Sequence, residues 1–384
     1  MIPDKNISYL NALRGVAVCG VVLSHIVYRT IDLHNELSII LSYGQLGVQL
    51  FFFISALTLC ISFDRDQNLI FFYIKRFFRI APLYYFAIFF YFLWENFKYS
   101  YHSNQILIIS DYNLINILSN IFLLHGFYPY GNNNIVSGGW SIGAEVYFYI
   151  LFPFLFFLVK KNKLLSNIFL LLFYILFIFF LRQFFLSEEF DKIVFRTFLQ
   201  LIPFYAGLIF YFKFFNTLEK FNSILLLLLI TLMSLIIMVL GGSIFIFEKK
   251  SFLMTSLMLV ISSFSFFYII GVFSNIRFFL KKKIKVHNFF KILYYKLFTF
   301  FVNLGICSYS VYVIHFFIRD IVIYLYKYFS IYKLLPAIIF VIILWVLIVL
   351  ISYFIGKITR NFIEVPGINL GRFIIKKIKD FKYL

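Results

Sequence analysis

The sequence predicts an all-α fold, a polytopic transmembrane helical bundle of about ten spans. Its composition is the first reason: 63% of the residues are hydrophobic, only 13% are charged, and the mean hydropathy is +0.95. Such values lie far outside the usual range of soluble globular domains. The second reason is that apolar runs of about 20 residues, long enough to cross a bilayer as helices, recur along the chain.

These apolar runs place the expected spans. They are residues 8–28, 37–62, 77–94, 140–159, 164–186, 195–212, 222–240, 251–273, 299–319 and 334–356. A further apolar segment, 114–127, is short and contains three polar residues, Asn116, Asn120 and His125, so we expect it to be interfacial or re-entrant. Residues 1–356 are thus expected to form the transmembrane domain, and residues 357–384 a basic cytoplasmic tail.

The 35 Lys and Arg residues predict the orientation, because positively charged loops stay in the cytoplasm. Most of them fall on the inner side when both termini are cytoplasmic, so we expect a multi-pass protein of the inner (plasma) membrane. The net charge of +19 gathers at helix ends and in cytoplasmic loops, which favours anionic membrane lipids over nucleic acid as a partner. The basic segment 276–298 is either an amphipathic segment on the inner leaflet or a plain topology signal.

The cysteines indicate no covalent or metal framework. Cys19, Cys60 and Cys307 all fall within expected spans, and no Cys-x-x-Cys spacing occurs. The sequence therefore predicts neither disulfides nor a metal site. The first apolar run also lacks a clear cleavage site, so no cleavable signal peptide is expected.

Ionisable residues at membrane depth are costly and mark candidate functional positions. In "LRGVAVCGVVLSH", residues 13–25, Arg14 and His25 are separated by about three helical turns plus 20°, so they share one helix face. They lie about 16 Å apart along the axis, with the arginine in the inner half and the histidine in the outer half. The alternative is that Arg14 snorkels to the interface and that His25 only packs against a neighbouring helix.

A second cluster lies in "YIKRFFRIAPLYY", residues 73–85. Arg76 and Arg79 are helical neighbours near the expected cytoplasmic boundary. Paired guanidinium groups suit phosphate because they are planar, bidentate donors that are always charged. The alternative is an ordinary topology anchor. Pro82 is expected to kink or restart the helix.

Two later stretches carry the remaining candidates. In "SGGWSIGAEVYFYILFP", residues 137–153, Glu145 is the one acidic residue clearly inside an expected span, and a lone buried carboxylate needs a partner. In "SYSVYVIHFF", residues 308–317, the spacing puts Ser308, Tyr312 and His315 on one helix face. The topology places His25, Glu145 and His315 within about 8 Å of the outer ends of their spans, so an imidazole is expected to pair with the carboxylate. The arginines are expected towards the opposite side, and a protonated Glu145 with a packing His315 is the alternative.

These four stretches, in this order, resemble the integral-membrane acyltransferase 3 family, which includes bacterial O-antigen and exopolysaccharide O-acetylases. The matching pieces are "LRGVAVCGVVLSH", "RFFRIAPLYY", "WSIGAEVYFY" and "SYSVYVIHF". The resemblance extends over nearly the whole chain. It implies that an acyl group, commonly acetyl, passes from acyl-coenzyme A to a hydroxyl group of a sugar or lipid-linked glycan.

The resemblance also implies roles for the residues. Acyl transfer to an alcohol needs a base for the hydroxyl proton, and His25 is the expected catalytic base, with Glu145 orienting an imidazole. Arg14, Arg76 and Arg79 are expected to hold the phosphates of the acetyl-CoA or other acyl-CoA donor. The positions expected to bind substrate are Trp140, Ser141, Ser308, Tyr312 and His315.

A transporter or flippase for an anionic or glycan-lipid substrate is the alternative from another functional class. Buried Arg and His would then mark a transport pathway. Paired, interrupted helices in two related halves would favour this alternative, and the sequence shows no such halves. A membrane scaffold without chemistry would not need charges at depth.

Overall fold

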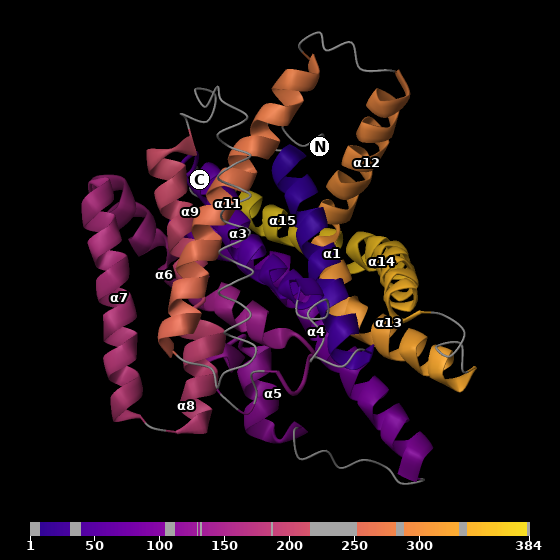
Figure 1. The fold of residues 1–384 in the computed structure, drawn as a ribbon. Helices are drawn as coiled ribbons and strands as arrows, with labels where there is room; N and C mark the ends of the chain where they lie inside the picture. Colours follow the sequence, from indigo (N-terminus) through magenta and orange to yellow (C-terminus); the bar gives the residue numbers. More distant parts are fainter. Residues whose placement is uncertain are drawn as a thin grey trace.

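The computed structural model describes residues 8–30, 40–103, 112–128, 130, 133–185, 187–215, 252–281, 288–329 and 336–381 (Figure 1). Within these ranges the chain is almost entirely helical and forms no strand. Eight helical stretches of this part are long and apolar enough to cross a membrane. The predicted all-α polytopic bundle is therefore confirmed.

The helices follow the chain in a simple order. The α-helices are α1 (Ser8–Thr30), α3 (Gly47–Phe63), α4 (Leu69–Ser103), α5 (Leu114–Ile121), α6 (Gly139–Lys161), α7 (Leu164–Phe184), α8 (Glu188–Ile193), α9 (Leu201–Lys213), α11 (Phe252–Lys281), α12 (Asn288–Ile306), α13 (Ser308–Tyr328), α14 (Ala337–Thr359) and α15 (Val365–Phe381). Short 3-10 helices lie at η1 (Tyr43–Leu46) and η3 (His125–Phe127), and π-helices at η4 (Val194–Phe198) and η7 (Arg360–Glu364).

Helix α1 lies at the centre and packs against α3, α12, α13 and α14. Small residues allow the closest of these contacts, because a Cβ atom on Gly15 would overlap the carbonyl group of Phe301, and one on Gly305 that of Asn11. Trp345 of α14 donates a hydrogen bond to the Cys19 carbonyl at 2.8 Å. The central helix thus has contacts on several sides, which suits its buried charged residue.

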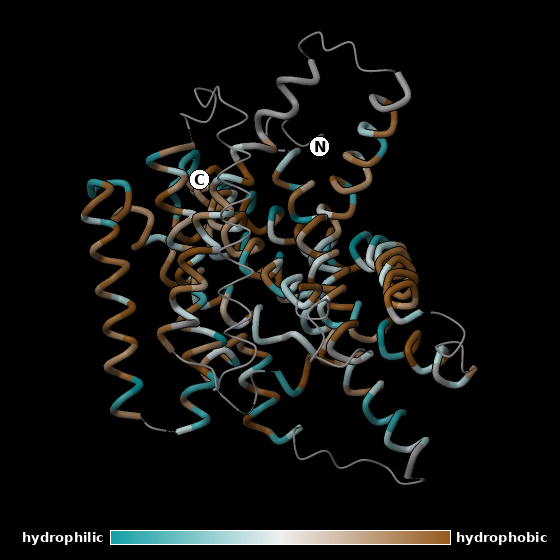
Figure 2. The backbone as a smooth tube through the Cα atoms, in the orientation of Figure 1, coloured by the Kyte–Doolittle hydropathy of each residue, from teal (hydrophilic) through white to brown (hydrophobic). Residues whose placement is uncertain are grey.

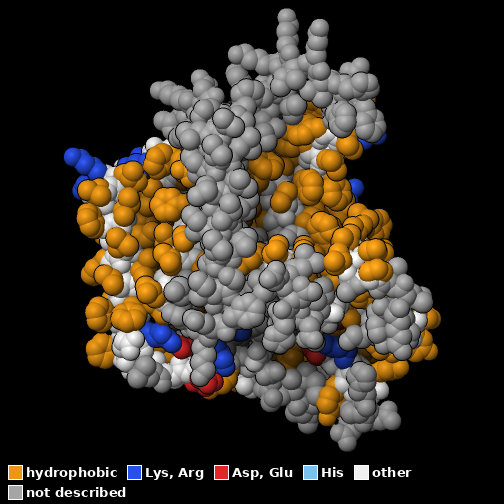
Figure 3. Space-filling view, in the orientation of Figure 1, with side chains coloured by type: hydrophobic (Ala, Val, Ile, Leu, Met, Phe, Trp, Pro, Cys, Tyr) orange, Lys and Arg blue, Asp and Glu red, His pale blue; other side chains and the backbone are white. Residues whose placement is uncertain are grey.

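The outer surface is apolar, as a bilayer requires. Helix α7 stands at one edge of the bundle and exposes Phe173, Phe177, Phe180 and Phe184 (Figure 1). Figure 2 shows hydrophobic residues along the length of α7 and α14. On the face drawn in Figure 3, hydrophobic side chains cover the middle height, and charged side chains gather towards the upper and lower edges. This belt indicates the part of the surface that faces lipid.

One expected span has the wrong bounds. Residues 299–319 are not one helix, because the chain breaks at Cys307 between α12 and α13. The apolar pattern continues through this break, so hydropathy alone does not reveal it; α12 follows α1, whereas α13 packs mainly against α14. The expected span 222–240 lies outside the described residues. Residues 276–298 form the end of α11 and the start of α12, with 282–287 outside the described residues.

The expected tail is also ordered along most of its length. Helix α14 continues through η7 into α15, and α15 packs against α4. A Cβ atom on Gly371 would lie 2.8 Å from the Cβ of Phe78, and one on Gly367 would lie 2.5 Å from the Cγ of Pro82. Pro82 lies inside the continuous helix α4 rather than at a restart. Residues 365–381 are therefore part of the packed body.

The short segment 114–127 does not span, because α5 has only eight residues. Its polar residues point into the protein. Tyr84 donates a hydrogen bond to the Asn120 side chain at 2.6 Å, and His125 Nε2 lies 3.1 Å from the Tyr84 hydroxyl and 3.0 Å from the Gly139 carbonyl oxygen. His125 and Asn120 are buried. This polar network fixes the segment against the first turn of α6.

Candidate active site

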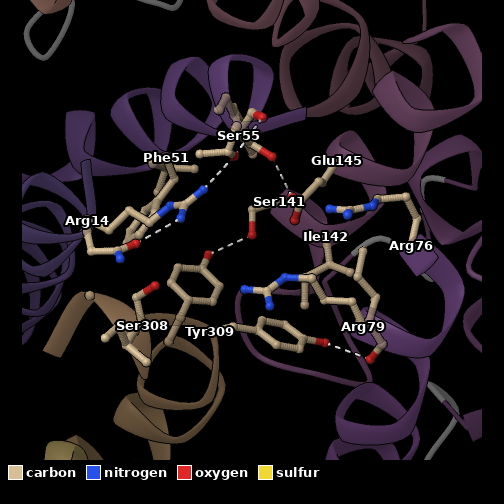
Figure 4. Close-up of a pocket in the computed structure, with 18 of the residues that line it drawn as sticks. Arg14, Phe51, Ser55, Arg76, Arg79, Ser141, Ile142, Glu145, Ser308 and Tyr309 are labelled. Carbon is tan, nitrogen blue, oxygen red and sulfur yellow. Dashed lines mark hydrogen bonds between the residues drawn. The ribbon is translucent and has the colours of Figure 1, made fainter. Parts of the chain in front are cut away.

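A cavity of about 360 Å³ lies inside the bundle among α1, α3, α4, α6, α12, α13 and η7. Its polar wall consists of Asn11, Arg14, Ser55, Thr58, Arg76, Arg79, Ser141, Glu145, Tyr149, Ser308, Tyr309, Tyr312 and Arg360. Figure 4 shows these groups pointing inward from helices far apart in the sequence, with Arg14 on one side and Arg76 and Arg79 on the other. The volume falls in the range of small-molecule sites.

Arg14 reaches the cavity from α1. Its guanidinium donates hydrogen bonds to Thr58 Oγ1 at 2.8 Å and to Asn11 Oδ1 at 3.3 Å. Both acceptors are neutral, and Arg14 forms no ion pair with a carboxylate in the described part of the chain. Its positive charge therefore remains available to a ligand.

Arg76 extends from α4 between aromatic rings. Its guanidinium carbon lies 6.0 Å from the centre of the Phe72 ring and 5.9 Å from that of Tyr149. These cation–π contacts stabilise the charge where water is scarce. The Nε atom is buried and has no hydrogen-bond partner among the described residues. Arg76 therefore keeps an unused donor.

Arg79, one turn further along α4, has a carboxylate partner that the sequence did not suggest. Its Nη1 lies 3.4 Å from Oε1 of Glu364, a residue of η7 that is only 1% exposed. Ser310 of α13 donates a hydrogen bond to the other oxygen of Glu364 at 3.0 Å. The ion pair and this hydrogen bond join α4, α13 and η7 at one wall of the cavity.

Glu145 also belongs to the arginine cavity. Its Oε1 accepts a hydrogen bond from Ser55 at 3.0 Å and one from Tyr149 on the same helix. The expected pair between Glu145 and an imidazole is therefore wrong. Helix α6 begins at the buried residues Gly138 and Gly139, inside the protein rather than at its outer surface. This deep start carries Glu145 further inward than the length of the span suggests.

The two candidate imidazoles lie together in a separate place. The ring centroids of His25 and His315 are 5.4 Å apart, and His25 lies 4.5 Å from the ring of Phe316. His315 Nδ1 is 2.5 Å from the Tyr312 carbonyl oxygen, and because a carbonyl only accepts, Nδ1 is the protonated nitrogen. His315 Nε2 is buried and has no partner among the described residues. Neither histidine lines the arginine cavity.

Tyr312 stands between the cavity and the histidines. Its hydroxyl lies 2.9 Å from Ser141 Oγ and 3.2 Å from the Gly138 carbonyl oxygen, while its ring is 5.4 Å from that of His315. Gly138 has φ +80°, and a Cβ there would lie 2.7 Å from Phe316, so only glycine suits this position. Trp140, expected to wall the pocket, instead contacts Phe52 edge-on at 6.5 Å and lies outside the lining.

Sequence reasoning missed several lining residues. Tyr149 comes four residues after Glu145 and could have been found from that spacing. Ser55 and Thr58 are isolated polar residues in an apolar helix, a weak signal. Arg360 and Glu364 were hidden in the expected tail, where basic residues are ordinary.

The structure thus defines a polytopic membrane protein with a buried, arginine-lined cavity. The family model for the acyltransferase domain, acyltransferase 3, matches residues 7–357. The chain belongs to this family, and it is a membrane acyltransferase. Comparisons with curated proteins and with solved structures gave no significant match.

Proposed function

We propose that the protein transfers an acyl group, commonly acetyl, from acyl-coenzyme A to a hydroxyl group of a cell-surface or lipid-linked glycan. The observation that carries the proposal is the convergence of Arg14, Arg76 and Arg79 on one cavity. Coenzyme A carries several phosphate charges, and guanidinium groups are the donors best shaped to hold phosphate. The donor enters from the cytoplasm, consistent with both termini there and with a location in the inner membrane.

The chemistry requires a base for the acceptor hydroxyl. In this proposal His25 takes the hydroxyl proton as the oxygen attacks the thioester carbonyl. The carbon–sulfur bond breaks, the thiolate of coenzyme A takes a proton, and the glycan carries the new ester. His25 is half-buried and makes no hydrogen bond to the described residues, which leaves its ring nitrogens free for this role.

The donor's acyl arm links the two places. A donor anchored in the arginine cavity must extend past Tyr312 to bring its thioester to His25. Ser141, Ser308 and Tyr312 line the cavity on that side and are proposed to contact the arm. Glu145 is proposed to hold Ser55 and Tyr149 in place and to offset part of the arginine charge, not to act on an imidazole.

Anionic lipids are proposed as a second partner. Helix α15 carries Arg372, Lys376 and Lys377, while Leu370 and Phe373 are more than half exposed. A helix with basic and apolar exposed faces suits the surface of an anionic leaflet. Such contacts would hold α15 and the neighbouring η7 at the cytoplasmic boundary.

The proposed reaction is tested with membranes containing the protein and acetyl-CoA labelled in its acetyl group. Wild-type membranes are expected to place base-labile, ester-linked label on glycan, whereas His25→Ala membranes are not. His102→Ala, a histidine near the end of α4, is the matched control, and both variants are compared at equal abundance. Glycan that crosses the membrane without gaining label would favour the transporter or flippase alternative.

A further inference from the structure

Arg360 enters the cavity from a segment that the family match does not include. The match ends at residue 357, and Arg360 is the first residue of the π-helix η7. Its side chain lines the same cavity as Arg14, Arg76 and Arg79. π-Helical turns are rare and frequently occur at functional sites.

Packing on both sides fixes the position of η7. Before it, a Cβ atom on Gly356 would lie 2.8 Å from Val311 Cγ2, so the end of α14 fits closely against α13. After it, Gly367 packs against Pro82 of α4. Glu364, within η7, is anchored by Arg79 and Ser310. Arg360 is therefore held at the cavity wall by the fold.

The guanidinium of Arg360 has an unused donor. Its Nε atom is buried and has no hydrogen-bond partner among the described residues. Arg76 shows the same feature in the same cavity. Buried polar groups are normally hydrogen-bonded, so two orphan guanidinium donors facing one space indicate a missing acceptor.

The charges indicate what kind of acceptor is missing. Four arginines meet two carboxylates at this site, with Glu364 paired to Arg79 and Glu145 already accepting from two hydroxyls. Two positive charges remain without a carboxylate. Because uncompensated buried charge is costly, a ligand with two or more negative charges fits better than a monoanion.

We propose that Arg360 is a fourth guanidinium of the cavity and binds a phosphate group of a polyanionic ligand. The identity of that ligand as acyl-coenzyme A rests on the proposed function. The role of Arg360 does not, because it follows from the charge and the unused donors of the cavity. The C-terminal junction of α14 and α15 thus completes the site.

The test measures ligand binding by the full-length protein in lipid nanodiscs, with pyrophosphate, coenzyme A and acetate as separate probes. Arg360→Gln is expected to raise the Kd for pyrophosphate and for coenzyme A about tenfold or more, because a charge-assisted, bidentate contact is lost. Arg360→Lys keeps the charge but not the planar fork and is expected to lie between. Lys357→Gln, an exposed residue of the same helix end, is the matched control and is expected to change Kd less than twofold. Acetate is expected not to bind saturably.

The outcomes separate the two proposals. Pyrophosphate binding that is equal in Arg360→Gln and wild type would overturn the role of Arg360, as would saturable acetate binding of similar strength. If Arg360→Gln fails to fold, an Arg360→Lys protein with wild-type affinity for both polyanions contradicts the bidentate contact. Wild-type binding of pyrophosphate but not of coenzyme A would refute the proposed donor and leave Arg360 supported. Binding of neither probe would refute both.

Discussion

His25 of α1 and His315 of α13 face each other, with ring centroids 5.4 Å apart. The Tyr312 carbonyl fixes the proton of His315 on Nδ1, so Nε2 carries a lone pair in a buried environment. The two rings therefore differ: His315 is held in one tautomer, whereas His25 is half-buried and without such a restraint. This difference suits His25 as the base and His315 as its positioning partner.

His25→Ala is expected to reduce acyl transfer by about 100-fold or more, because general-base catalysis contributes at least that factor. Donor binding should remain near wild type, since the arginine cavity does not include His25. Rates and Kd values measured on one preparation check both statements. His315→Gln should lower the rate less than His25→Ala, and a larger loss for His315→Gln would reverse the assignment of the base.

Arg14→Lys is expected to weaken donor binding by about tenfold without changing membrane insertion, because lysine keeps the charge but loses the fork that reaches Thr58 and Asn11. The measurement is the Kd for coenzyme A at matched abundance. Arg65→Lys, at an exposed arginine, is the control. Equal Kd values for the two variants would leave Arg14 as a structural residue only.

Ser141 and Tyr312 are expected to act as one unit. Tyr312→Phe and Ser141→Ala should each lower the free energy of unfolding by about 1 kcal/mol, the usual value of a buried hydrogen bond. The double variant should cost less than the sum, because both single changes remove the same contact. Thermal unfolding in nanodiscs measures the cycle, and strictly additive losses would show that the two hydroxyls are not coupled.

Gly143→Ala is expected to lower protein stability, and with it abundance in the membrane. A Cβ atom at this position would lie 2.7 Å from the Cα of Gly126, a backbone atom that cannot yield without moving η3. Val146→Ala, on the same helix and only half-buried, is the control. The comparison uses unfolding temperatures of both variants; an unchanged value for Gly143→Ala would mean that η3 does not pack as described.

The topology is expected to place α15 inside and the segment around Tyr130 outside. Cys19, Cys60 and Cys307 are buried, so they should give little background in thiol labelling. A cysteine replacing exposed Lys376 should react with a membrane-impermeant reagent only after permeabilisation, and one replacing exposed Tyr130 should react in intact cells. Labelling of both positions from outside would contradict the orientation.

The sequence by itself determined the class of fold and most of the chemistry-bearing residues. Composition and apolar runs predict helices that cross a membrane, because both signals depend only on local residues. The helical period likewise predicts that Arg76 neighbours Arg79 and that Tyr312 neighbours His315. These predictions need no knowledge of which helices touch.

Only the tertiary structure decided which of these residues meet. The deep start of α6 at Gly138 carries Glu145 to the arginines, and the break at Cys307 turns α13 so that His315 reaches His25. Arg360 and Glu364 join the site because glycines let α14 and α15 approach α13 and α4 closely. The physical reason is that periodicity fixes the face of a residue on its own helix, whereas its depth and its partners depend on long-range packing between helices.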